Sequence, residues 1–101
     1  MVGGISSMPV KGFNTDLIFH GEKFHVQTED WGEDNPVFVS RVFCNGAVLE
    51  SVKNPYDIKI FKKNYIDYEE VIGAALKKQH FDILEKLHLK FASAGLNSTE
   101  G

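Results

Sequence analysis

The chain has 101 residues, of which 43% are hydrophobic and 25% are charged, the composition of one globular domain. A net charge of −3 and a single arginine, Arg41, argue against a nucleic-acid-binding protein. No apolar run approaches the roughly 20 residues required to cross a bilayer, so we expect no membrane span. The only cysteine, Cys44, has no partner for an internal disulfide, which favours the reducing cytoplasm.

Residues 13–28 predict a β-hairpin. Apolar and polar residues alternate on both sides of the His-Gly pair at 20–21, which suits a two-residue turn. One face of the hairpin is then apolar and the other is polar. The predicted cross-strand pairs are Leu17 with Phe24, Thr15 with Val26, Phe13 with Thr28, Asp16 with His25, and Asn14 with Gln27.

A second hairpin is predicted for 37–53, after an acidic loop at 29–36. The Asn-Gly pair at 45–46 is the strongest turn signal in the chain, because both residues tolerate the positive φ of a type I′ turn. Apolar residues lie on both faces of these strands, so one face can cover a helix while the other meets a partner. The predicted cross-strand pairs are Phe43 with Val48 and Arg41 with Glu50.

The segment 57–65 is ambiguous in its pattern. Ile58 and Ile60 can form a short edge strand, with Lys62 and Lys63 protecting it from aggregation.

The best-marked element is a long helix over residues 67–94. Asp67 is the expected N-cap, with Glu70 completing a capping box, and Ile66 is expected to pack on Val71 as a hydrophobic staple. Apolar residues then recur at helical spacing along one stripe: Ile72, Leu76, Ile83, Leu84, Leu87 and Phe91. At about 1.5 Å per residue this helix is roughly 40 Å long, and we expect it to project beyond the sheet.

These elements predict an α+β fold, an antiparallel β-sheet of about four strands in two hairpins with one long C-terminal helix. The single domain is expected at 12–95, with Gly95 ending the helix. Flexible tails are expected at 1–11 and 96–101.

The residue pattern contains no recognisable catalytic apparatus. Cys44, His25 and Asp16 are the residue types of a nucleophilic site, but nothing brings Cys44 to the cross-strand pair. His80 and His88 are eight residues apart, which is not a chelating spacing, and the acidic loop lacks the order of an EF-hand. His80 falls on the apolar stripe, where a hydrogen-bonded core histidine is expected. We therefore predict no catalytic residues, no metal and no cofactor.

Two features predict a protein-binding surface. Trp31 lies in the acidic loop, where it either packs on the sheet or stands exposed as an anchor, and tryptophan is enriched in binding hot spots. Phe81 lies off the apolar stripe on a charged flank, so we expect the helix to bury a second face against another protein or a second copy of the chain. The predicted contact residues are Asp30, Trp31, Glu33, Phe81, Lys77 and Lys78.

A small-ligand or nucleic-acid-binding module is the alternative function. Its anion-facing patch would consist of four lysines, beside the aromatic residues Tyr56 and Tyr65. The lysines are Lys53, Lys59, Lys62 and Lys63.

Four motifs together resemble a family of small bacterial proteins. They are GFNTD at 12–16, FHVQTED at 24–30, Asn-Gly at 45–46 and KQH at 78–80, and the resemblance extends from Gly12 to about Leu89. Size and layout are also similar to the RomX-type cell-polarity factors of gliding and predatory bacteria. This resemblance implies complexes with a Ras-like GTPase and a response-regulator-like protein, stimulation of nucleotide exchange, and no substrate chemistry. It therefore implies a cytoplasmic adaptor or regulator of cell polarity and motility.

Overall fold

The computed structural model describes residues 11–100, with side chains described as far as Ala92. The predicted N-terminal tail lies, except for Lys11, outside the described residues, and so does Gly101. No α-helix in the described part of the chain is long and apolar enough to cross a membrane.

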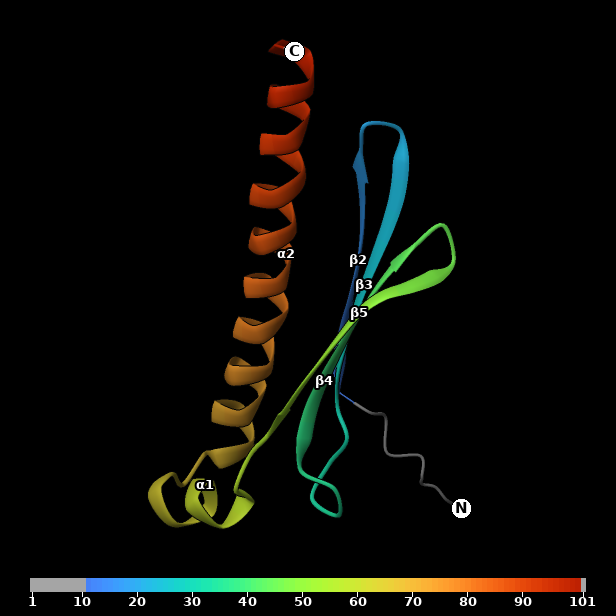
Figure 1. Cartoon of the computed structure of the whole chain (residues 1–101). Coiled ribbons are helices and arrows are strands. Elements are labelled where there is room, and N and C mark those ends of the chain that lie inside the picture. Colours follow the sequence, from blue (N-terminus) through green and yellow to red (C-terminus); the bar gives the residue numbers. More distant parts are fainter. Residues whose placement is uncertain (1–10, 101) are drawn as a thin grey trace.

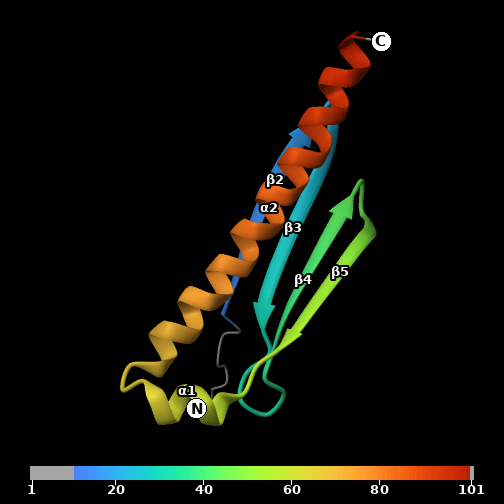
Figure 2. The same ribbon diagram turned by 60° about the vertical axis from the view of Figure 1, so that its left-hand side comes forward.

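The fold is α+β, as the sequence predicts: a four-stranded antiparallel sheet with helices packed on one face (Figure 1). The strands β2 (Gly12–Phe19), β3 (Glu22–Asp30), β4 (Val37–Cys44) and β5 (Ala47–Pro55) are neighbours in chain order. The short helix α1 (Ile58–Asn64) and the long helix α2 (Tyr68–Glu100) follow. Helix α2 runs along the β2–β3 hairpin, and the tip of the β4–β5 hairpin diverges from it (Figure 2).

Both hairpin turns are set by residues with positive φ. His20 and Gly21 have φ of 53° and 81°, and Asn45 and Gly46 have φ of 53° and 87°, as a type I′ turn requires. All five cross-strand pairs predicted for the first hairpin are present in the β2–β3 ladder. Phe43 also lies opposite Val48, as predicted.

A β-bulge breaks the second predicted register. The β4–β5 ladder shifts between Val42 and Phe43, so Arg41 lies opposite Ser51 and the predicted Arg41–Glu50 pair does not form. Glu50 instead lies opposite Val42, on the helix side, where its carboxylate is 3.7 Å from the Nζ of Lys86. The extra residue in β5 is Leu49, because no residue of β4 pairs with it.

Residues 58–64 form a helix, so the edge strand considered for this segment is wrong. Asp57 is the N-cap of α1, and its carboxylate accepts a hydrogen bond of 2.9 Å from the backbone N–H of Lys59. Ile58 and Phe61 then pack beside Phe38 and Tyr56 at the end of the core. Of the apolar pair that suggested a strand, Ile58 packs against the core, whereas Ile60 is 54% exposed.

Helix α2 begins directly after Asp67, whose carbonyl accepts the backbone N–H of Val71 at 3.2 Å. The predicted hydrophobic staple is wrong, because Ile66 is fully exposed and cannot pack on Val71. The predicted stop at Gly95 is also wrong, because α2 continues to Glu100.

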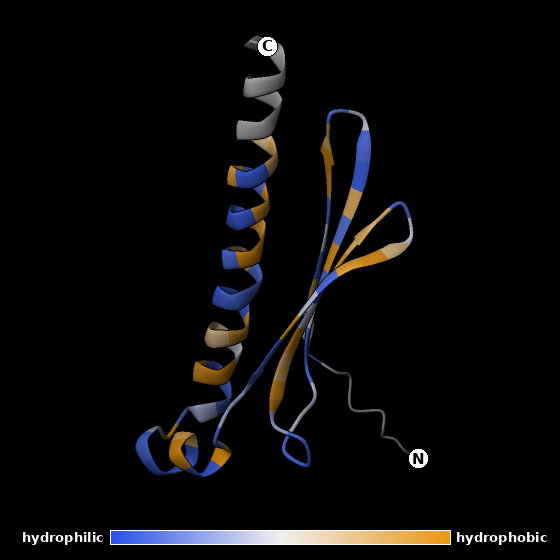
Figure 3. Cartoon of the chain, viewed as in Figure 1, coloured by the Kyte–Doolittle hydropathy of each residue, from blue (hydrophilic) through white to orange (hydrophobic). Residues whose placement is uncertain are grey.

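The core lies between α2 and the sheet in two apolar clusters. One contains Phe24, Val26, Val42, Ile83 and Leu87, and the other contains Phe38, Ile72 and Leu76. Hydrophobic and hydrophilic residues alternate along α2, as expected for a helix with one buried stripe (Figure 3). Polar residues separate the two clusters, and they are described below.

Candidate functional site

The six predicted contact residues lie in two groups, one at the end of β3 and in the loop after it, and one on α2. Asp30 is the last residue of β3, opposite Phe38 of the core, and Trp31 and Glu33 follow it in the loop. The Trp31 ring lies on the face that α2 leaves bare, here called the outer face. Phe81, Lys77 and Lys78 belong to α2, on the other face. No hydrogen bond, ion pair or aromatic contact between the described residues joins the two groups.

Trp31 is packed on the outer face rather than standing away from it. Its ring lies 5.9 Å from the guanidinium carbon of Arg41 and 5.7 Å from the Nζ of Lys53, and its indole N–H donates to Glu29 at 3.3 Å. Val39 lies opposite Lys53 on the same face and is only 1% exposed. We infer that the ring covers Val39, and 38% of Trp31 remains exposed.

The acidic residues of this loop hold the loop itself. Asp30 Oδ1 accepts the Tyr56 hydroxyl at 2.7 Å and the Gly32 backbone N–H at 2.9 Å. Partial burial and Asp30 raise the pKa of Tyr56, which therefore remains a hydrogen-bond donor. Glu33 accepts from Lys62 of α1 at 2.9 Å. Asp30 and Glu33 are thus bound within the chain, although sequence pattern alone presented them as free acids.

In the second group, Phe81 lies on the flank of α2 nearest β2. Phe81 is 52% exposed, and Lys77 Nζ lies 5.9 Å from its ring, while Lys78 pairs with Asp82 at 2.9 Å. Beside Phe81 lies a groove of about 400 Å³ between β2 and α2. Its other lining residues are Leu17, Phe19, Leu84, Glu85, His88 and Leu89.

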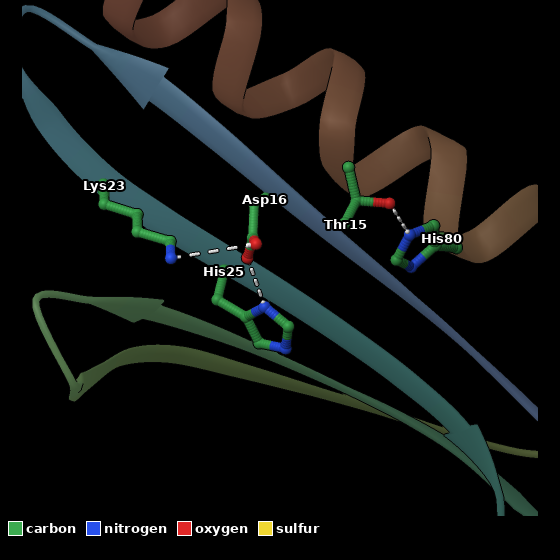
Figure 4. Close-up of polar contacts among 5 residues, drawn as sticks. All are labelled: Thr15, Asp16, Lys23, His25 and His80. Atoms are coloured by element: carbon green, nitrogen blue, oxygen red, sulfur yellow. Dashed lines mark hydrogen bonds and ion pairs between the residues drawn. The ribbon is translucent and has the colours of Figure 1, made fainter.

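The predicted Asp16–His25 pair forms on the outer face. His25 Nδ1 lies 2.7 Å from Asp16 Oδ1, and Lys23 Nζ lies 3.8 Å from the other oxygen (Figure 4). The hydrogen bond from His25 holds the pKa of Asp16 below its usual value. A shallow groove of about 630 Å³ includes these residues and Phe43. Cys44 lies on the opposite face beside Glu22, as its pairing with Phe24 requires, so the sheet separates it from His25.

A row of polar side chains crosses the whole sheet beneath α2, here called the polar row; it is buried at Thr28, Ser40 and His80 and exposed at Asn54. Every strand contributes one residue and α2 contributes two: Thr15, Thr28, Ser40, Asn54, Gln79 and His80. His80 is 1% exposed, and its two ring nitrogens lie 2.8 Å from Thr28 Oγ1 and 2.8 Å from Thr15 Oγ1. The prediction of a hydrogen-bonded core histidine is confirmed.

One arrangement of protons satisfies the polar row with His80 in a neutral tautomer. Gln79 donates to Ser40 at 2.9 Å, so the Ser40 hydroxyl proton is available for Thr28, 2.7 Å away. Thr28 can then donate to Nδ1 of His80, whose Nε2–H donates to Thr15. This direction satisfies every group, and it requires a neutral ring. Burial lowers the pKa of His80, in agreement with that state.

The lysines of the alternative function do not form one patch. Lys53 lies over Trp31 on the outer face, whereas the other three belong to α1. Lys62 binds Glu33, which raises the pKa of the lysine. Among the described residues, no group of three or more metal-ligating side chains is present.

No family model, no curated protein and no solved structure matches the chain.

Proposed function

We propose that the chain is a protein-interaction module, an adaptor or regulator without chemistry of its own, that binds a partner through the outer face of the sheet. The single observation that supports this function is the Trp31 ring held between Arg41 and Lys53. Tryptophan and arginine are the side chains most often found at binding hot spots, and a ring already fixed on a sheet loses little entropy on binding.

The chemistry of the partner follows from this surface. Arg41 and Lys53 favour a partner that brings acidic groups around an apolar centre. The resemblance to polarity factors suggests a Ras-like GTPase or a receiver-type regulator in the cytoplasm. The single cysteine of the chain, Cys44, is a free thiol, which agrees with a reducing cytoplasm.

The test is affinity capture of the tagged chain and its variants from an extract of the source cells. We expect the wild-type chain to retain a GTPase- or receiver-type protein and Trp31→Ala to lose it. Tyr65→Ala is the matched control, since Tyr65 is an exposed aromatic residue on another part of the surface. Equal recovery with Trp31→Ala, in a variant with a native circular dichroism spectrum, would contradict the proposal.

A second variant guards against a folding effect, because Trp31 also covers Val39. Arg41→Glu leaves the ring in place but reverses the charge beside it. With the captured protein purified, we expect titration calorimetry to show affinity reduced about 30-fold or more by either variant, the range of a hot spot. Unchanged affinity of both variants would place the binding surface elsewhere.

A further inference from the structure

The two edges of the sheet differ in how they are protected. Strand β5 carries three features that discourage edge-to-edge pairing: the bulge at Leu49, the charge of Lys53, and Pro55, which has no N–H. Strand β2 has none of these, and its eight residues pair with β3 without interruption. Its one charged side chain, Asp16, is already paired with His25 and Lys23. The described residues therefore present one open edge and one guarded edge.

The phase of the β2–β3 ladder shows which backbone groups lie at the open edge. The Asp30 backbone N–H donates to the Lys11 carbonyl at 3.0 Å, so these two residues form a hydrogen-bonded pair. Hydrogen-bonded pairs alternate with non-hydrogen-bonded pairs along an antiparallel ladder. Counting from Lys11, the odd-numbered residues of β2 therefore form the backbone hydrogen bonds to β3. The N–H and C=O groups of Asn14, Asp16 and Ile18 consequently point away from the sheet.

We propose that this edge pairs with the β2 strand of a second copy of the chain, antiparallel and centred on Thr15. In that register Asn14 lies opposite Asp16 of the second copy on the outer face. The pair occurs twice because the dimer is symmetric, and in each pair the Asn14 side-chain amide can donate a hydrogen bond to the Asp16 carboxylate. Phe13 lies opposite Leu17 of the second copy on the helix face. Centring on Asp16 would instead oppose two carboxylates, which is unfavourable, and centring on Asn14 would lose both Asn–Asp pairs.

The helix flank provides the apolar part of the same interface. Helix α2 lies above β3, and two β3 strands would be separated by three strand spacings, roughly 14 Å. Directly packed helices have axes about 8–10 Å apart, which is less than the separation expected between the two α2 helices of the dimer. Side chains must therefore fill the space between these two helices. Phe81 and Leu89 are 52% and 62% exposed and line the groove on this side of α2, where a second copy would cover them.

The polar row ends at the same place. Its hydrogen bonds run from Asn54 to Thr15, which in the proton arrangement described above accepts from His80 and retains its own hydroxyl proton. Thr15 of the second copy would lie directly opposite, close enough for one of the two hydroxyls to donate to the other. This interface lies at the β2 edge and the helix side, so it is independent of the Trp31 surface proposed above.

The test is the mass of the full chain by sedimentation equilibrium over a range of concentrations, with matched charge variants. We expect the wild-type chain to reach twice its 11.3 kDa mass. Asn14→Asp, which opposes carboxylates across the pair, should shift the association at least tenfold toward monomer. Ser51→Asp adds the same charge on the guarded edge and should leave the association constant unchanged. The exchange variant Asn14→Asp/Asp16→Asn restores each Asn–Asp pair and should restore the dimer.

A disulfide tests the centre of the register independently. In a Cys44→Ser background, Thr15→Cys should form a cross-linked dimer on mild oxidation, because non-bonded antiparallel partners have Cα atoms about 4.5 Å apart. Phe13→Cys, which lies opposite Leu17 of the second copy, should cross-link far less. A wild-type chain that is monomeric at every concentration would overturn the proposal, and so would a dimer that Asn14→Asp leaves unchanged.

Discussion

The Nδ1 atom of His80 lies 2.8 Å from Oγ1 of Thr28, and this contact joins the long helix to the central strand β3 in the middle of an otherwise apolar core. Polar groups this deeply buried lose their bonds to water, so each must find a partner within the protein. The polar row meets that requirement at every step. It consequently fixes the position of α2 along the sheet, because a shift by one turn would leave several of these groups unpaired.

Replacement of His80 by alanine is expected to lower the free energy of unfolding by about 3 kcal/mol. The substitution leaves a cavity, and the hydroxyls of Thr15 and Thr28 lose their partner on α2. Urea unfolding followed by circular dichroism measures the change. His88→Ala is the control, because His88 is an exposed histidine of the same helix, and a change above about 0.5 kcal/mol there is not expected. Equal losses in the two variants would contradict a special role for the buried ring.

Stability should fall as the pH is lowered from 7 to 5. Burial, with a smaller effect from His25, lowers the pKa of His80 below its ordinary value of 6.5. The unfolded chain then binds a proton in a range where the folded chain does not, so acid favours unfolding by up to about 1.4 kcal/mol per pH unit. The lowered pKa of Asp16 contributes stability that is lost only as the pH falls below about 5, outside this range. His80→Gln should give a flatter pH profile, and an identical profile would refute the assignment.

The hydrogen bond from Tyr56 to Asp30 should contribute about 1 kcal/mol to stability. Tyr56→Phe removes only the hydroxyl, so the packing of the ring against Phe38 remains. Since Trp31 follows Asp30 and is the only tryptophan, its fluorescence emission reports directly on the loop. We expect a red shift with Tyr56→Phe and none with Tyr65→Phe. An unchanged spectrum and midpoint in the first variant would show that Asp30 holds the loop without Tyr56.

Asp57→Ala is expected to cost about 1 kcal/mol, because the N-cap of α1 loses its bond to the backbone of Lys59. Amide hydrogen exchange should accelerate at Lys59 and in the turn that follows it. Asp34→Ala provides the comparison, as an exposed acid in the loop before β4. Exchange at Lys59 that remains as slow as in the wild-type chain would mean that the cap is not what holds this helix.

Local signals were sufficient to predict both hairpins. The turn pairs at 20–21 and 45–46 require positive φ, and alternation on each side then determines which residues face each other. The start of α2 directly after Asp67 was also predicted, and the Asp67 backbone carbonyl accepts the N–H groups of Glu70 and Val71 there.

The features that the sequence did not predict depend on contacts between segments that are distant in the chain. Leu49 fits either face of a strand, so nothing in its neighbours marks the bulge that moves Glu50 toward Lys86. The polar row is formed by residues from four strands and a helix, and only the position of His80 on the apolar stripe pointed to it. Asp30 was interpreted as a surface acid because Tyr56, its partner, lies 26 residues away in sequence.

The bulge at Leu49 also sets a limit on assembly. A sheet with two open edges can add a copy at each side and grow without end, whereas a sheet with one open edge is saturated by a single addition. In the proposed assembly, the bulge, Lys53 and Pro55 of β5 together limit each molecule to one partner. Deleting Leu49 would leave Val48 and Glu50 on their present faces while the ladder became continuous. We expect such a chain to form species larger than a pair, visible as a tail of higher mass in sedimentation velocity.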